Sequence, residues 1–181
     1  MKKLYRVLLI AIVLQAALVA EGFKLESSDI SEQLSVDQVY RGYGCHGNNI
    51  SPELRWSGEP RGTKSFAVTL YDPDAPTGKG WWHWIVFNIP ASVHELPRGA
   101  GDPKRGKLPR GAVQSITDFG TIGFGGACPP KGDRPHRYIF TVYALDVDHL
   151  SLDPNTSPAK IGSVIGKHAL AKASLMARYG R

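Results

Sequence analysis

Residues 71–84 read Tyr71-Asp72-Pro73-Asp74-Ala75-Pro76-Thr77-Gly78-Lys79-Gly80-Trp81-Trp82-His83-Trp84, and they join two predicted strands. The six residues before this segment form the first strand, with Phe66, Val68 and Leu70 on one face. Asp72 continues the same alternation, so its carboxylate projects from the end of an apolar face. The prolines of the segment lack backbone N–H groups and stiffen the turn.

The second strand is predicted over Trp81 to Ile89. Alternation of period two assigns the following residues to one of its faces: Trp81, His83, Ile85, Phe87 and Ile89. The end of one strand therefore supplies a carboxylate, and the neighbouring strand supplies an imidazole in an aromatic setting.

A second segment, residues 123–142, is expected to lie beside residues 71–84. Residues 123–132 read Gly123-Phe124-Gly125-Gly126-Ala127-Cys128-Pro129-Pro130-Lys131-Gly132, and a predicted strand starts at His136. Alternation places His136, Tyr138, Phe140 and Val142 on one face of that strand. Glycine lets a backbone approach a ligand closely, and consecutive prolines make a rigid rim. We expect the two segments to border one pocket.

Four motifs along the chain resemble the phosphatidylethanolamine-binding protein family, and most closely its exported bacterial, Raf-kinase-inhibitor-like members. In chain order, the motifs are NISPELRW at residues 49–56, DPDAP with WWHW, GACPPKGD, and the HRY triplet at residues 136–138. The resemblance extends over roughly Phe23 to Leu145. It implies a pocket that binds phosphate-containing groups. One departure from the family is that Trp82-His83 stands where eukaryotic members have a histidine pair.

The predicted fold class is mostly β, an antiparallel β-sandwich with Greek-key links. The resemblance implies a large central sheet, a smaller second sheet and peripheral helices. A C-terminal helix is predicted from the N-cap Ser157 and Pro158 onward, with apolar positions to Leu175 and Gly180 as its stop.

The chain has 181 residues and suits one domain, residues 23–181, behind a predicted signal peptide at residues 1–22. Cleavage after Ala20 or after Gly22 is consistent with the small residues that precede a signal-peptide cleavage site. The expected location is periplasmic or secreted. Removing residues 1–22 takes away three cations and one anion, which lowers the net charge from +6 to +4. That mild charge does not indicate nucleic-acid binding.

Five cations form a basic cluster in a Gly/Pro-rich loop: Arg98, Lys104, Arg105, Lys107 and Arg110. A solvated loop is the favoured interpretation, and attraction of anionic head groups or an acidic partner is the alternative.

Two cysteines in an exported chain suggest a disulfide between Cys45 and Cys128. The alternative is a free nucleophilic Cys128 close to His83 or His136.

The candidate ligand-binding residues are Asp72, Asp74, Trp81, His83, Pro129, Pro130, His136 and Tyr138. Two imidazoles and a phenol offer hydrogen-bond donors to anionic oxygens. We expect Asp72 to orient His83 or to accept from a ligand ammonium group, and nearby carboxylates to hold an imidazole cationic. The aromatic wall suits a choline or ethanolamine group.

The expected function is binding of a small anionic or phosphorylated ligand, such as phosphate or a phospholipid head group, without catalysis and without a cofactor. Membrane association is expected only through head-group binding. The resemblance also implies a protein partner that this protein modulates or inhibits, as kinase and protease inhibitors of the family do. The alternative is a metal-dependent or hydrolytic enzyme that uses Asp72, His83 and His136; neither an HExxH nor a GxSxG motif supports it. Monomer and homodimer both remain open.

Overall fold

A computed structural model of the protein describes residues 22–181. The predicted signal peptide lies outside the described residues except for Gly22, so it stays a prediction. None of the helices in the described range has the length and apolar character that a membrane span requires.

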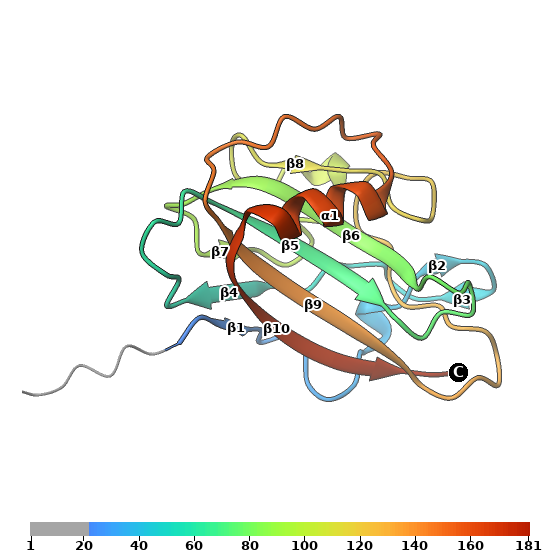
Figure 1. The fold of residues 1–181 in the computed structure, drawn as a ribbon. Coiled ribbons are helices and arrows are strands. Elements are labelled where there is room, and N and C mark those ends of the chain that lie inside the picture. The colour runs from blue at the N-terminus through green and yellow to red at the C-terminus, as the bar shows by residue number, and fades with distance from the viewer. Residues whose placement is uncertain (1–21) are drawn as a thin grey trace, which may run out of the picture.

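The fold is built on an antiparallel sheet of five strands in the order β10-β9-β5-β6-β8 (Figure 1). Its strands are β5 (Ser65–Asp72), β6 (Trp81–Pro90), β8 (Val113–Gln114), β9 (His136–Leu145) and β10 (Ala169–Tyr179). A three-stranded sheet contains β1 (Lys24–Glu26), β4 (Leu54–Ser57) and β7 (Glu95–Leu96). The hairpin of β2 (Arg41–Gly42) and β3 (Cys45–His46) forms a separate two-stranded sheet.

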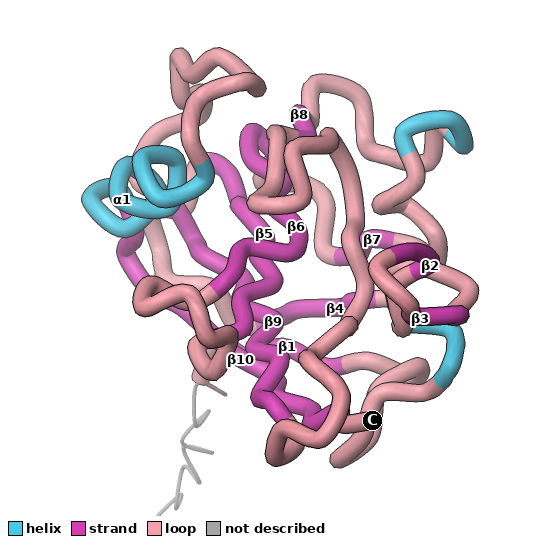
Figure 2. Tube along the Cα trace, turned by 90° about the vertical axis from the view of Figure 1, so that its right-hand side faces the viewer, coloured by secondary structure: helices cyan, strands magenta, loops and turns pink. Residues whose placement is uncertain are grey.

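Two apolar clusters cover the two faces of the large sheet. On one face, Phe66 and Phe140 pack with Trp56 of the three-stranded sheet. On the other face, Ile161 and Ile165 of α1 (Pro158–His168) pack against the sheet. Each fully buried isoleucine stabilises the fold by about 1.5–3 kcal/mol. Figure 2 shows α1 and the β2–β3 hairpin on opposite sides of the strands, and the predicted sandwich is confirmed.

A close approach of helix and sheet requires glycine at position 162. A Cβ atom there would lie 2.6 Å from a ring carbon of Trp82. Because such a separation is shorter than van der Waals contact, only glycine lets α1 lie directly on β6.

The predicted alternation holds in β5 and β9 but is wrong in β6. Phe66, Val68 and Leu70 share the face toward the three-stranded sheet, as expected. In β6, Ile85 and Phe87 face α1 instead. The pairing of β5 with β6 shifts register twice, between Phe66 and Val68 and between Leu70 and Tyr71. Each irregularity inserts residues into β6 and moves the following side chains to the other face.

The predicted C-terminal helix is correct only in its first half. It starts at Pro158 after Ser157, although the Ser157 side chain forms no cap hydrogen bond, and it ends at His168. The next eleven residues form β10, which pairs along β9. The exposure of its side chains alternates along the strand, with Ala173 and Ala177 buried. Pairing with β9 therefore outweighs the helix propensity of its Ala, Leu, Lys, Met and Arg residues.

The expected additional peripheral helices are also a wrong prediction for the described residues. Besides α1, residues 22–181 contain only two single-turn 3₁₀ helices, η1 (Val36–Gln38) and η2 (Pro103–Arg105).

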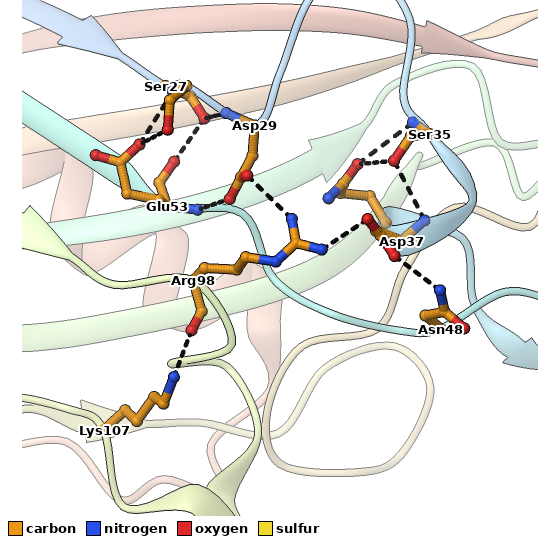
Figure 3. A network of polar contacts seen from close by, with 10 residues as sticks. Ser27, Asp29, Ser35, Asp37, Asn48, Glu53, Arg98 and Lys107 are labelled. Atoms are coloured by element: carbon orange, nitrogen blue, oxygen red, sulfur yellow. Dashed lines mark hydrogen bonds and ion pairs between the residues drawn. The ribbon is translucent and has the colours of Figure 1, made fainter.

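A polar network ties the N-terminal segment to the loops beside it (Figure 3). The Arg98 guanidinium donates to Asp29 at 3.0 Å and to Asp37 at 2.6 Å. Asp37 also accepts from the Asn48 amide at 2.7 Å, and these contacts hold its pKa below the usual range. Arg105 pairs with Asp102 at 3.3 Å. Two of the five cations in the basic loop are thus neutralised within the fold.

Candidate functional site

A pocket of about 200 Å³ opens where β5 ends and β9 begins. Its lining contains Asp72, Trp81, His83, His136 and Tyr138, together with Cys128, Pro129 and Pro130. Seven of the eight predicted site residues therefore meet here, since only Asp74 is missing from the lining. Five further residues complete the wall: Tyr43, Ala75, Pro76, Thr77 and Phe119.

The bottom of the pocket holds a buried carboxylate–imidazole pair. Nδ1–H of His136 donates to Asp72 Oδ2 at 2.8 Å, and both side chains are about 3% exposed. The other ring nitrogen of His136 lies 3.4 Å from Asp133 Oδ2. Asp72 also accepts from the Asp74 backbone N–H at 2.8 Å. Asp72 thus orients His136, and the expectation that it orients His83 is wrong.

His83 is fixed by backbone groups. Nδ1 lies 2.8 Å from the Gly125 carbonyl oxygen and 3.1 Å from that of Gly126. Because both partners are acceptors, Nδ1 carries the proton and Nε2 is left as an acceptor. Burial lowers the pKa of His83, and this effect exceeds the opposing influence of the Gly125 carbonyl and Asp72. The ring is therefore neutral near pH 7, so His83 is not an imidazole that nearby carboxylates hold cationic.

The register shift in β6 explains where His83 points. Leu70 pairs with Trp84 and Tyr71 pairs with Trp82, so His83 has no partner of its own on β5. A bulge of this kind re-aims a side chain without ending the strand. The His83 ring consequently contacts Tyr138 edge-on, with 5.2 Å between ring centroids.

Two buried donors in the pocket have no partner among the described residues. They are the indole Nε1–H of Trp81 and the hydroxyl of Tyr138. Burial, followed by the nearby Asp72 charge, raises the pKa of Tyr138, so the phenol stays protonated. A buried polar group without a partner costs about 1–3 kcal/mol. The residues that carry both donors line the pocket, which makes them candidates to bind an acceptor there.

Aromatic rings form the outer wall. Phe119 lies edge-on to Trp81, with ring centroids 5.5 Å apart, and stacks on Tyr40 at 4.3 Å. Tyr43 is 70% exposed and stacks on Tyr40 at 5.7 Å. Sequence reasoning missed Tyr43 and Phe119 because loop residues have no strand alternation. The only signal was an aromatic residue beside glycine, as in Gly42-Tyr43-Gly44.

Asp74 is the predicted site residue that the fold does not bring to the pocket. Its carboxylate accepts from Nε of Arg137 at 2.8 Å and from Nη2 at 2.7 Å. Arg134 approaches it at 3.5 Å. These contacts, with Arg137 first, hold the pKa of Asp74 far below its usual range. These contacts brace the turn, and the assignment of Asp74 as a ligand-binding residue stays a prediction.

The cysteines form the predicted disulfide. Cys45 and Cys128 are bonded across a sequence separation of 83 residues. The bond joins β3 to the loop that carries Pro129 and Pro130. A free nucleophilic Cys128 is therefore the wrong alternative.

Side chains suited to a metal do not converge here. Across residues 22–181, no group of three or more His, Cys, Asp and Glu residues is arranged to hold a metal ion. The Nδ1 atoms of His83 and His136 are both occupied by protein acceptors.

Fold and pocket together define a class: a β-sandwich protein with a small aromatic-walled pocket at the end of its central sheet. The profile described as phosphatidylethanolamine-binding protein matches residues 26–180. The chain belongs to this family.

Two relatives come from Escherichia coli (strain K12). YbcL is 54% identical over 162 residues, which is 88% of each chain. YbhB is 49% identical over 158 residues, which is 86% of this chain and 99% of YbhB. The crystal structure of E. coli YbcL superimposes with a TM-score of 0.87 at 53% identity, covering 89% of this chain and 99% of that one. A homologue from Chlamydia trachomatis gives a TM-score of 0.73 at 33% identity, covering 88% of this chain and 98% of that one.

Proposed function

We propose that this protein binds the phosphoryl group of a small anionic or zwitterionic ligand, such as inorganic phosphate or a phospholipid head group. The observation that carries the proposal is a pair of residues, Trp81 and Tyr138, that line one pocket and whose buried donors, Nε1–H and O–H, have no hydrogen-bond partner among residues 22–181. Phosphoryl oxygens are acceptors only, apart from any P–OH, so they match this pair of donors.

Each remaining group in the pocket has a place in this chemistry. The Nε2 acceptor of His83 suits a P–OH proton or an ammonium proton of the ligand. The Nδ1–H of His136 shields the Asp72 carboxylate by its hydrogen bond, which lowers the repulsion of an incoming anion. The rings of Tyr43 and Phe119 offer faces to an ethanolamine or choline cation.

We further propose that the protein acts by binding and not by turnover. Orientation of His83 and His136 by fixed protein acceptors supports a preorganised binding site. Export is part of the same proposal, because residues 1–22 read as a signal peptide and the disulfide suits an oxidising compartment. A protein target, regulated through this pocket, remains a prediction from the family.

The test is a titration of the oxidised protein with inorganic phosphate and with glycerophosphoethanolamine, followed by calorimetry. Tyr138→Phe removes only the unpartnered hydroxyl, and we expect it to weaken binding about tenfold or more, as for a hydrogen bond to a charged group. Tyr143→Phe is the matched control, since Tyr143 lies on the same strand and packs toward α1. Equal affinities for wild type and Tyr138→Phe would refute the proposal, and hydrolysis of the phosphoester would move the protein to the enzyme class.

A further inference from the structure

Two walls of the pocket come from loops outside the large sheet. Tyr43 lies in the turn between β2 and β3, and Pro129 and Pro130 lie in the loop before β9. A β-bridge between Val39 and Ala127 joins the two loops at their base. Beyond that bridge, contacts other than strand pairing must set the distance between Tyr43 and the Pro129–Pro130 loop.

Arg181 makes such contacts with both loops. Its Nε–H donates to the Pro129 carbonyl oxygen at 2.7 Å, and Nη1–H donates to the Gly44 carbonyl oxygen at 2.8 Å. Nη2 lies 3.5 Å from the Tyr43 carbonyl oxygen. The Arg181 backbone carbonyl in turn accepts from the Gly132 N–H at 3.0 Å. One side chain and its own backbone thus join both walls.

The partners of this guanidinium differ from those of Arg98 and Arg137. Those two arginines bind aspartates, whereas Arg181 binds carbonyl oxygens and has no carboxylate partner in the part of the chain described. Its planar fork of N–H groups fixes the angle between the two loops.

The disulfide does not make this contact redundant. Cys45–Cys128 is a single link between the same loops, and the chain can still rotate about it. Gly44 directly precedes Cys45, and Pro129 directly follows Cys128. Arg181 therefore adds a further point of attachment to the disulfide and the Val39–Ala127 bridge, one residue beyond Cys128 in the chain.

We propose that Arg181 is a positioning residue of the pocket, clamping the Tyr43 turn to the Pro129–Pro130 loop so that the walls are preorganised for an anionic ligand. This inference rests on the proposed function. Arg181 is absent from the pocket lining and acts through the residues it holds. Preorganisation raises affinity because the ligand need not order the loops when it binds.

The experiment compares Arg181→Ala, Arg181→Lys and Arg178→Ala in the full, oxidised chain. Arg178 is exposed on β10, so its loss removes the same charge without the clamp. Phosphate affinity is measured by calorimetry, and amide hydrogen exchange is followed in residues 42–47 and 129–133.

We expect Arg181→Ala to weaken phosphate binding about three- to tenfold and to speed exchange in both loops. Arg178→Ala should change neither. Lysine at 181 should not restore either property, because an ammonium cannot span both carbonyl groups.

The outcomes separate the clamp from the pocket function. Full restoration by lysine, or unchanged affinity and exchange in Arg181→Ala, would overturn the clamp while leaving phosphate binding intact. If the wild-type protein binds neither phosphate nor glycerophosphoethanolamine, the proposed function fails. Hydrogen exchange then still decides whether Arg181 holds the two loops together.

Discussion

The network around Arg98 and the pocket around Tyr138 both contain buried or partly buried polar groups, but they differ in whether those groups have hydrogen-bond partners. Arg98, Asp29, Asp37 and Asn48 bind one another (Figure 3). The pocket leaves two buried donors without a partner. A satisfied network stabilises the fold, whereas unpartnered donors reduce stability and hold binding energy for a ligand. Gln38 and Trp56 also carry a buried donor without a partner, so the position of Trp81 and Tyr138 in a pocket lining is what marks their cluster as a binding site.

The largest expected effect comes from the covalent link in the pocket wall. The double variant Cys45→Ser/Cys128→Ser should lower the free energy of unfolding by about 4 kcal/mol on the chain-entropy account, since the bond closes a loop of more than 80 residues. Urea unfolding measures this loss. Reduction of the wild-type protein should reproduce it, and a change below about 1 kcal/mol would show that the walls hold without the bond.

A smaller loss is expected in the satisfied network. Arg98→Ala leaves Asp29 and Asp37 without their cation, and we expect a loss of about 1.5 kcal/mol because the groups are partly exposed. Phosphate affinity should stay within about twofold. Arg110→Ala, at an exposed site in the same basic loop, is the control and should leave stability unchanged. A loss of phosphate affinity in Arg98→Ala would contradict the assignment of the Arg98 network to a purely structural role.

The third prediction concerns pH and the buried neutral ring of His83. Its folded pKa lies below the ordinary 6.5, so the unfolded chain takes up a proton first as the pH falls. Stability from this group is complete above pH 6.5 and declines below it, by at most about 1.4 kcal/mol per pH unit until the folded ring protonates. Urea unfolding between pH 5 and 8 measures the slope, and NMR follows the His83 ring directly. A ring that titrates at or above pH 6.5 would contradict the assignment.

The smallest change in stability is expected for an unpartnered donor. Trp81→Phe removes the indole N–H and keeps an aromatic ring against Phe119. We expect stability to change by about 1 kcal/mol or less, while phosphate affinity falls about fivefold or more. Trp82→Phe is the control, because Trp82 packs toward α1. A large stability loss with unchanged affinity would mean that the indole is structural.

Much of the pocket follows from local sequence patterns. Alternation in two strands brings Asp72, His136 and Tyr138 together, and the Pro-Pro loop supplies a rigid rim. Asp74 shows the limit of that reasoning, since a residue two positions from Asp72 turns away from the pocket to Arg137. The partner that captures a carboxylate in a turn lies more than sixty residues away, and no local pattern reveals it.

The sequence by itself determined the strands β5 and β9, the start of α1, the cysteine pair and seven residues of the pocket lining. Only the tertiary structure decided that residues 169–179 form a strand, that β6 carries two irregularities and that Tyr43 and Phe119 close the wall. Periodicity and residue type act over a few neighbouring residues, so they can be read locally. Strand pairing, register and the approach of loops depend on contacts between distant segments, and these contacts override local preference when they bury more surface and satisfy more hydrogen bonds.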